Sequence, residues 1–446
     1  MTSFPRPRAS LHTLGCRLSQ AETSILADSL RRKGYQVVPF GGETDLLVLN
    51  TCSVTENAER DCRYAIRKTL RHSPGAFVAV TGCYAQTGVD QLRAVAGIDL
   101  LVGTQYKMRL PDYLPEPNVL RKRPAPEVVH TRSIDREDFT LPGTAYADST
   151  RALLKIQDGC NFMCTFCLIP FARGRERSRA LPDLLREASE LAAAGYRELV
   201  LTGVNIGQYD FDGSGLVDVI RRLEEIPEIE RIRISSIEPT TIADDLLAYM
   251  GASPKLCRYL HIPIQSADNA ILAAMNRRYT ADEYHRVIER AEAAIPELGL
   301  GTDVMVGFPG EDDAAFARTL AFVEEHPFSY CHVFSYSERP GTAAQKLSEK
   351  VPPACIAQRS RLLARLSNRK AAAFHQRYIG KTVSALFEKT VKEGRRHGTT
   401  GNFLRVAVPD DGVVANTIRN VVITGLSGET ALAELTIPQA APLAMA

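Results

Sequence analysis

The sequence predicts an α/β protein: an N-terminal open parallel sheet, a central partial (β/α)6 barrel and a small C-terminal all-β barrel. Two observations indicate this. Short apolar runs alternate with amphipathic helical stretches in the first hundred residues and again from 151 to about 346. After about residue 380, short β-type runs separated by glycines replace that pattern. We therefore expect domains at 1–112, 151–350 and 377–440, with a connector at 113–150 and a basic linking helix at 351–376.

The composition is that of an ordinary soluble protein with a large core. Of 446 residues, 45% are hydrophobic and 24% are charged, and the formal charge is only +2. This excludes a histone-like or strongly acidic chain, although a local basic face could still bind nucleic acid. No run approaches the roughly 18 apolar residues of a membrane span, and the first residues lack the apolar core of a signal peptide. We expect a cytoplasmic protein without a membrane partner.

In the first domain, each predicted strand is a short apolar run, and the helices carry apolar residues at three- and four-residue spacing. The expected order is strand 10–15, helix 19–33, strand 46–49, helix 58–72 and strand 76–81. Six prolines and a basic cluster at 121–123 then interrupt the pattern between 111 and 150. This composition is typical of a connector that partly covers its neighbours.

The central domain has the most regular alternation in the chain. Six strand–helix units in about 195 residues predict a partial barrel rather than a closed eightfold one. Polar residues and glycines follow the strands, on the rim where such barrels bind ligands. The predicted strands are 152–157, 198–202, 231–235, 259–262, 300–306 and 329–334, with the helices 181–194, 280–295 and 312–326 among those between them.

The segment 353–378 reads as one helix with six Arg and Lys residues and no acidic residue. Arg361, Arg365 and Arg369 recur every four residues and would share one face. A charged helix is usually only a solvated face, but this one directly precedes the β-type runs at 382–387, 403–408, 421–423 and 431–435. We favour RNA phosphate contact by these three arginines and by Arg395 and Arg396.

Three cysteines within eight residues are the strongest feature of the sequence. Cys160, Cys164 and Cys167 follow a predicted strand and the pair Asp158-Gly159. Soft thiolates in one loop can hold a metal centre. A structural zinc would want a fourth protein ligand, and none lies nearby in sequence, whereas a 4Fe-4S cluster on three thiolates leaves one iron open. Buried or zinc-binding cysteines are the weaker alternative.

This Cys-x3-Cys-x2-Cys spacing resembles that of the radical S-adenosylmethionine (radical SAM) superfamily. There the open iron binds SAM, and an electron from the cluster splits SAM to give a 5′-deoxyadenosyl radical. The resemblance extends over the whole central domain to the methylthiotransferases. It rests on residues 159–161, 164–167, 169–170, 172–174, 177–179, 201–203, 234–239, 261–266, 307–311 and 336–342.

A second set, Cys16, Cys52 and Cys83, is weak by spacing alone, since 35 and 30 residues intervene. Each follows the end of a predicted parallel strand, and neighbouring strands would bring these loop tips together. Three unrelated buried cysteines are the alternative. The family resemblance implies an auxiliary 4Fe-4S cluster here, whose open iron can hold a sulfide or methylsulfide. The remaining thiols are expected to be plain packing residues: Cys62, Cys257, Cys331 and Cys355.

The resemblance also implies SAM contacts on the barrel rim. The family uses the loop 307–311 against the adenine of SAM, although a tight turn explains its glycines equally well. Rim polar residues could bind a ribose or substrate, or simply cap helices. The expected SAM-binding residues are Gly203, Ser236, Gln265, Gly307 and Pro309. Lys155 and Asp158 lie near the cysteines by sequence only, and we assign them no role.

The C-terminal domain resembles a TRAM domain, a small RNA-binding β-barrel. Residues 398–403 match its glycine-rich turn, and Phe403 stands where the family commonly has an aromatic residue. Phe403 could stack on a base or belong to the core. The closest resemblance is to the bacterial enzymes that add a methylthio group to C2 of N6-threonylcarbamoyladenosine, beside the anticodon. It implies as partners the tRNA anticodon stem-loop, an electron donor such as flavodoxin or ferredoxin, and a sulfur donor.

Two departures and several alternatives complete the sequence prediction. Relatives often have Asn where this chain has Ser19, and a hydroxyl cannot replace both the donor and the acceptor of an amide. Ala267 replaces a frequent Gly. The alternatives are the same chemistry on isopentenyladenosine in tRNA or on a ribosomal-protein aspartate, simple radical SAM methylation, and an iron–sulfur RNA-binding protein without turnover.

Overall fold

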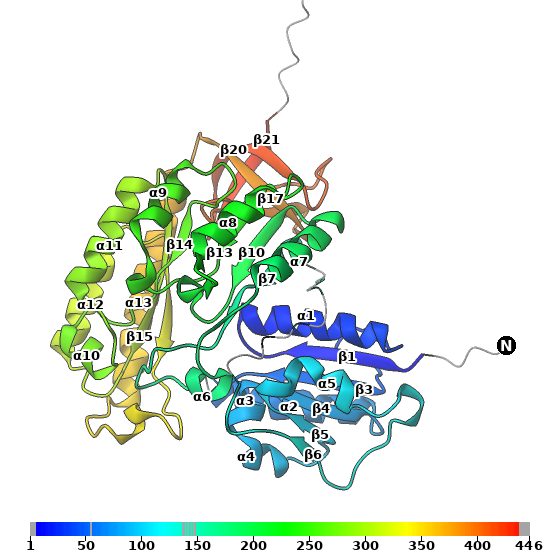
Figure 1. The fold of residues 1–446 in the computed structure, drawn as a ribbon. Coiled ribbons are helices and arrows are strands. Elements are labelled where there is room, and N and C mark those ends of the chain that lie inside the picture. Colours follow the sequence, from blue (N-terminus) through cyan, green and yellow to red (C-terminus); the bar gives the residue numbers. More distant parts are fainter. Residues whose placement is uncertain are drawn as a thin grey trace, which may run out of the picture.

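The computed structural model describes residues 6–53, 56–135, 139, 141, 144, 146 and 149–436. Three parts follow one another along the chain (Figure 1): a blue-to-cyan N-terminal sheet, a green-to-yellow central part and an orange-to-red C-terminal barrel. Among the described residues, no helix is both long and apolar enough to cross a membrane.

The N-terminal part is a six-stranded sheet in the order β2-β1-β3-β4-β5-β6, with every pairing parallel. The last strand lies in the segment 113–150, which we expected to be a connector, and it pairs with β5. The strands at the sheet's ends are three residues long, too short to show a periodicity. The strands are β1 Arg8–Thr13, β2 Gln36–Val38, β3 Leu46–Thr51, β4 Phe77–Gly82, β5 Leu100–Val102 and β6 Glu127–Val129.

The predicted open parallel sheet is confirmed, and two helices cover its opposite faces. Leu26 and Leu30 of α1 (Arg17–Arg32) pack with Leu46 and Val48, whereas α2 (Glu56–His72) packs on the other face through Ile66. Successive residues of β3 therefore serve both faces, which explains its continuous apolar run. Shorter helices are α3 Cys83–Thr87, α4 Val89–Arg93 and α5 Leu110–Tyr113, with the 3-10 helix η1 at Thr104–Arg109.

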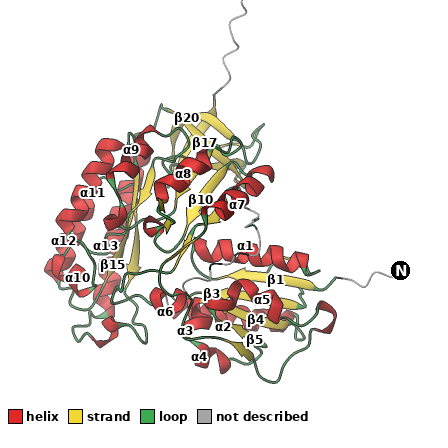
Figure 2. Cartoon of the chain, viewed as in Figure 1, coloured by secondary structure: helices red, strands yellow, loops and turns green. Residues whose placement is uncertain are grey.

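The central part has six parallel strands in two three-stranded sheets, β13-β10-β7 and β14-β15-β16. A bridge between Ile232 and Leu256 connects them, while no pairing joins β7 to β16 in the described chain, so the barrel is partial as predicted. Figure 2 shows the helices outside these strands. The strands are β7 Ala152–Lys155, β10 Glu198–Thr202, β13 Arg231–Ile234, β14 Tyr259–His261, β15 Gly299–Val306 and β16 Tyr330–Ser335.

The three central helices whose ranges were predicted begin and end within one residue of them: α7 Leu181–Ala193, α11 Ala281–Ala294 and α12 Asp313–Glu325. The other helices are α8 Leu216–Glu224, α9 Asp244–Ala252 and α10 Asn269–Ala274. A short antiparallel ribbon, β8 (Gln157–Asp158) with β9 (Arg177–Ser178), brackets the cysteine loop and helix α6 (Ile169–Arg173). A second ribbon joins β11 (Asp210–Phe211) and β12 (Ser214–Gly215).

The long basic helix α13 (Pro353–Gln376) leads into a closed barrel in the order β17-β18-β19-β21-β20. Its strand β18 was not expected, because its sequence is polar and contains a glycine. That strand takes up half of the segment 398–403, which we had treated as a turn. The strands are β17 Thr382–Lys392, β18 Arg395–Thr400, β19 Arg405–Pro409, β20 Ile418–Ser427 and β21 Thr430–Leu435.

Two buried arginines fasten the C-terminal barrel to the central part. Arg231 donates to the carbonyl oxygens of Thr399 and Ser384, at 3.0 and 2.8 Å. Arg233 donates to the carbonyl oxygen of Thr400 at 2.9 Å and is paired with Glu198 at 2.8 Å. Charge-assisted bonds to backbone oxygens of a partner element are among the stronger polar contacts, so this junction is firmly held.

Candidate functional site: two cysteine triads beside one cavity

Cys160, Cys164 and Cys167 lie in the loop between β8 and α6, at the end of the first barrel strand, as predicted. The loop starts at Gly159, whose φ is +69°. A Cβ at this position would collide with the carbonyl oxygen of Arg175. Only glycine meets both requirements, so this residue sets the entry of the chain into the loop.

A distant segment, 274–278, anchors the same loop. Thr165 donates its amide to Met275 O at 3.0 Å and its hydroxyl to Ala274 O at 2.8 Å. The side chain of Asn276 donates to Met163 O at 2.8 Å. Hydrogen bonds of this kind hold a loop in one conformation, so the segment 274–278 helps to fix the loop that carries the three thiols.

Each thiol sulfur in this loop accepts one hydrogen bond. The amides of Phe162 and Ile169 donate to Cys160 and Cys167, both at 3.4 Å. Arg277 donates to Cys164 Sγ at 3.3 Å and is also paired with Glu238. Such donors stabilise sulfur that carries negative charge and tune iron–sulfur centres. Arg277 could not be predicted from the sequence, because nothing in its local pattern distinguishes it from a surface arginine.

The chemistry of these thiols fits a metal cluster. Burial raises the pKa of Cys160 to about 11 and that of Cys167 to about 12. At neutral pH the thiolates therefore form only when a metal replaces their protons. Soft thiolates are the ligands of iron–sulfur clusters, so three of them in one loop fit a 4Fe-4S cluster.

Cys52 and Cys83 directly follow β3 and β4, and Cys16 follows β1 after two residues. These three strands are neighbours in the sheet. A Cβ on Gly15 would come within 3.3 Å of Cys52 Sγ, so the first two loops touch. Gly82, with φ +101°, packs against the backbone of Thr51, which brings the third loop beside the second. The expectation that adjacent strands gather these loop tips is therefore met.

Ser19 lies in the first turn of α1 and is buried. Its hydroxyl oxygen is 3.7 Å from Cys16 Sγ, and its carbonyl oxygen accepts a bond of 2.9 Å from the Asn50 side chain. A hydroxyl can thus still touch the cysteine sulfur, although it offers fewer hydrogen bonds than the amide common in relatives.

One cavity of about 270 Å³ is lined by residues from both cysteine regions. Its wall contains Cys167 of the barrel-side triad and Ser53, the residue after Cys52. Other lining residues include Phe166, Ile169, Gln265, Asp303, Met305, Phe334, Tyr336 and Arg339. A small molecule in this cavity would therefore lie against Cys167 and beside the loop that carries Cys52.

Of the five expected SAM-binding residues, Gln265 alone is among the described residues that line this cavity. Its φ is +66°, and its backbone exchanges hydrogen bonds with β15, donating to Asp303 O and accepting from Met305 N, both at 2.9 Å. Ser236 is half-buried. Gly203 packs against Gln157, and Gly307 and Pro309 are buried beside the Glu311–Arg359 ion pair. SAM contact by these residues stays a prediction.

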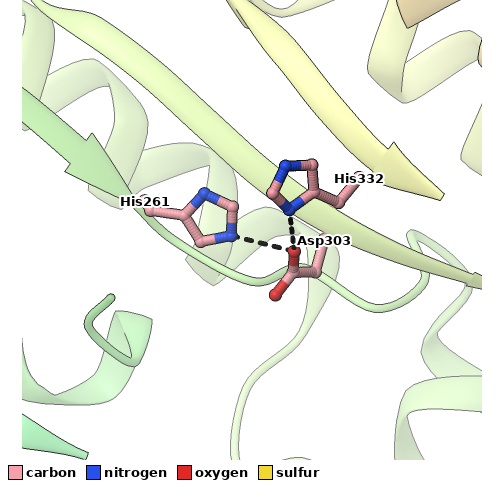
Figure 3. Close-up of side chains that lie close together, drawn as sticks. All are labelled: His261, Asp303 and His332. Carbon is pink, nitrogen blue, oxygen red and sulfur yellow. Dashed lines mark hydrogen bonds and ion pairs between the residues drawn. The ribbon is translucent and has the colours of Figure 1, made fainter. Parts of the chain in front are cut away.

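Three polar side chains meet inside the barrel near the cavity (Figure 3). Asp303 Oδ1 is 2.9 Å from His261 Nε2 and 3.4 Å from His332 Nδ1. Burial favours the neutral acid, but the hydrogen bonds from both histidines outweigh it and lower the pKa of Asp303 to about 2. This group could not be predicted from the sequence, because its members come from three different strands.

Lys155 and Asp158, to which we assigned no role, belong to a buried charge network. Lys155 is paired with Asp158 at 2.7 Å and with Glu22 of α1 at 2.9 Å. Glu22 also pairs with Lys107 and with Arg173. The network crosses from the N-terminal sheet to the central barrel, so it joins the two parts that carry the cysteine triads.

The expected RNA-contacting residues differ in their surroundings. Arg361 and Arg365 are exposed on α13, and Arg369 is exposed but paired with Glu324. Arg395 is half-buried, and Arg396 is paired with Asp410 at 2.8 Å. Of the four remaining cysteines, Cys62, Cys257 and Cys331 are buried and Cys355 is half-buried, in keeping with packing roles.

Phe403 packs within the protein. Its ring stacks on Tyr259 of β14, with centroids 4.6 Å apart, and the Arg233 guanidinium lies 5.4 Å from its centroid. One ring face is therefore occupied by the interface between the C-terminal barrel and the central part.

Comparisons with known proteins agree with this arrangement. The model of the radical SAM superfamily matches residues 154–323, and that of the uncharacterized protein family UPF0004 matches residues 8–103. A radical SAM methyltransferase, TsrM from Kitasatospora setae, has a solved structure that aligns with a TM-score of 0.53. It is 14% identical and covers 76% of this chain and 77% of its own, so it supports the fold alone.

Curated relatives are much more similar in sequence. Threonylcarbamoyladenosine tRNA methylthiotransferase MtaB of Bacillus subtilis is 36% identical over 89% of each chain. The Aquifex aeolicus protein of the same name is 38% identical over 85% of this chain and 92% of its own. A tRNA-2-methylthio-N(6)-dimethylallyladenosine synthase of Cereibacter sphaeroides is 36% identical over 92% and 94%.

A partial parallel barrel with three thiols in the loop after its first strand defines a radical SAM enzyme. Together with the N-terminal sheet and the full-length relatives, these features show that the chain belongs to the radical SAM methylthiotransferase family. The resemblance drawn from the sequence motifs is thereby confirmed. Membership implies SAM and a 4Fe-4S cluster.

Proposed function

We propose that this protein adds a methylthio group to C2 of N6-threonylcarbamoyladenosine at position 37 of tRNA, using SAM and two 4Fe-4S clusters. The observation that carries the proposal is the shared cavity, whose wall contains Cys167 and Ser53, the residue after Cys52. Transfer of a methylthio group needs a radical source and a sulfur source close to one substrate carbon. A cavity lined by residues from both cysteine regions supports the presence of both sources at one substrate.

The substrate assignment has two supports. The Bacillus subtilis and Aquifex aeolicus relatives are named for threonylcarbamoyladenosine. In addition, the buried side chain of Arg339 lies in the wall of the cavity. The threonyl group of this nucleoside carries a carboxylate, which a guanidinium recognises well, whereas a dimethylallyl group carries none. The dimethylallyladenosine substrate of the Cereibacter sphaeroides relative is the second candidate, because that relative is equally similar.

Cys160, Cys164 and Cys167 would hold the cluster that binds SAM, and Cys16, Cys52 and Cys83 would hold the auxiliary one. When bound, the two clusters supply the electron for SAM cleavage and a site for the sulfur atom. The chain itself orients these groups. Arg277 and two backbone amides donate to the three sulfurs on the barrel side. The glycines at 15, 82 and 159 let the loops approach closely.

Further partners follow from the same proposal. A low-potential donor such as flavodoxin or ferredoxin would supply electrons, and a separate sulfur donor would restore the transferred sulfur. Exposed Arg361 and Arg365 on α13 would contact tRNA phosphates. A cytoplasmic location stays a prediction.

The decisive experiment is nucleoside mass spectrometry of tRNA from a strain that lacks this gene. We expect 2-methylthio-threonylcarbamoyladenosine to disappear while threonylcarbamoyladenosine accumulates, and a plasmid copy to restore it. A plasmid copy with Cys16, Cys52 and Cys83 all changed to alanine should not restore it. Loss of 2-methylthio-dimethylallyladenosine instead would establish the second candidate, and unchanged tRNA would refute both.

A further inference from the structure

The inner face of the edge strand β16 carries a row of aromatic rings. Tyr330, His332 and Phe334 alternate along the strand and so point to one side. The ring centroids of Tyr330 and His332 are 5.0 Å apart, and those of His332 and Phe334 are 6.2 Å apart. Phe403 of the C-terminal barrel continues the row, 6.0 Å from Tyr330. We call these four residues the aromatic row.

Its two ends differ in accessibility. Phe403 and Tyr330 are fixed by Tyr259, which stacks on the first and is hydrogen-bonded to the second. In contrast, the His332 side chain is 57% exposed and Phe334 is 45% exposed. Exposure of a phenylalanine ring to water is unfavourable, and exposed apolar surface beside a cavity is typical of a binding site. The half of the row that faces solvent is thus the half nearest the cysteine triads.

A cavity adjoins each end of the aromatic row. Phe334 lies in the wall of the 270 Å³ reaction cavity. Tyr330, His332 and Phe403 line a second cavity of about 430 Å³. All three parts of the chain contribute to the second cavity, which also contains Arg17 of the N-terminal part, Asn368 of α13, and Arg405 and Glu429 of the C-terminal barrel. The aromatic row therefore runs from the second cavity, which all three parts of the chain line, to the reaction cavity.

The second cavity holds Arg17, a half-buried cation whose guanidinium lies 5.8 Å from the centroid of the Phe403 ring. Burial lowers the pKa of Arg17; Tyr259 and Tyr330 oppose this shift, and Arg151 and Arg233 add to it. Within the part of the chain that the structure describes, no carboxylate forms an ion pair with Arg17. Arg405 is exposed and Glu429 is the acidic residue of the same wall. A half-buried guanidinium without a counter-ion is costly, so this cavity is suited to an anionic group such as a phosphate.

We propose that the aromatic row is the path of single-stranded RNA into the reaction cavity. Bases next to the target adenosine stack on Phe334 and His332, and a backbone phosphate lies between Arg17 and Arg405. Rings on which bases stack, flanked by cations that contact phosphates, are the recurring chemistry of single-strand recognition. A duplex has its bases already stacked and paired and would gain little from the row. This inference rests on the proposed function and specifies how its RNA substrate is held.

The test measures binding by the full-length, cluster-loaded protein. The probes are a fluorescently labelled anticodon stem-loop RNA and a fully paired RNA duplex of equal length. Because stacking is lost, Phe334→Ala and Phe334→Leu should each weaken binding of the stem-loop about tenfold, with little change for the duplex. Phe334→Tyr, which keeps a flat ring, should bind like the wild type. Tyr64→Ala, another exposed aromatic at 63%, is the matched control.

The phosphate contact has a separate readout. Arg17→Gln should weaken stem-loop binding and reduce the slope of log affinity against log salt by about one. Arg222→Gln, on the exposed face of α8, should leave the slope unchanged. Iron content of each variant shows that the clusters are retained.

Two outcomes would overturn the inference. Equal stem-loop affinity for the wild type, Phe334→Ala and Phe334→Leu would show that the row is not a stacking surface. Equal losses for stem-loop and duplex would show that it does not select single strands. If the wild type methylthiolates tRNA while either result holds, the proposed function stands and only this inference falls. If the wild type neither binds nor modifies tRNA, both fall.

Discussion

Glu22 of the N-terminal part and Arg173 of the central part form a two-point ion pair. Arg173 Nη1 is 2.9 Å from Glu22 Oε1, and Nη2 is 3.0 Å from Oε2. Both side chains are 1% exposed. Glu22 lies on α1, which starts after Cys16, and Arg173 ends α6, which starts after Cys167. The pair therefore fixes the position of one cysteine triad relative to the other.

Removing the negative charge at Glu22 should uncouple SAM cleavage from transfer of the methylthio group to tRNA. Glu22→Gln leaves Lys107, Lys155 and Arg173 buried around a neutral amide, and breaking a buried pair costs about 3–5 kcal/mol. We expect both clusters to be retained and SAM cleavage to continue. Little methylthiolated product should form. The measurement is the ratio of 5′-deoxyadenosine to methylthiolated tRNA. Glu43→Gln, which breaks the exposed pair with Arg8, is the control, and an unchanged ratio in Glu22→Gln would contradict the prediction.

The hydrogen bond from Arg277 should help to retain the cluster on the barrel side. Arg277→Gln removes the cation beside Cys164 and leaves Glu238 without its partner. Loss of such a supporting contact typically lowers metal affinity about 10–100-fold. Iron per chain should fall from about eight toward about four. Arg278→Gln, which changes an exposed neighbour over the Phe162 ring, should keep the full iron content.

Gly159 should tolerate no side chain. In Gly159→Ala the positive φ adds about 1–2 kcal/mol of strain, and the new Cβ collides with the Arg175 carbonyl. We expect lower thermal stability and loss of the barrel-side cluster, measured by iron content and melting temperature. Gly195→Ala separates backbone strain from the collision. The φ of Gly195 is +93°, but nothing lies within 4 Å of a Cβ added at this position. A Gly159→Ala variant no worse than Gly195→Ala would be evidence against the collision.

Asp303 should stabilise the protein in a pH-dependent way. Its pKa in the folded protein is about 2, below the unfolded value of about 3.9. The folded state thus prefers the ionised form, and the stabilisation, roughly 2 kcal/mol, is complete above pH 4 and disappears as the pH falls from 4 toward 2. The difference in unfolding free energy between wild type and Asp303→Asn should therefore shrink at low pH. Asp411→Asn, an exposed change, should show no such trend.

The sequence by itself determined most of the longer elements and the family. The six central strands could be predicted, as could the strands that precede Cys16, Cys52 and Cys83. Each of them is a short apolar run that can be recognised from neighbouring residues alone. The loop Cys160–Cys167 could be predicted because all three thiols lie within eight residues. Strands β2, β5, β6 and β18 could not, since three-residue or polar strands exist only through their pairing partners.

Only the tertiary structure decided which distant residues serve the site. Arg277 meets Cys164 across 113 residues, and Glu22 meets Arg173 across 151. Phe403 turned out to be packed on Tyr259, and the accessible ring in the reaction cavity is Phe334. The physical reason is that such contacts arise when separate elements pack against one another. They leave no periodicity or spacing in the chain, so a pattern-based prediction has nothing to detect.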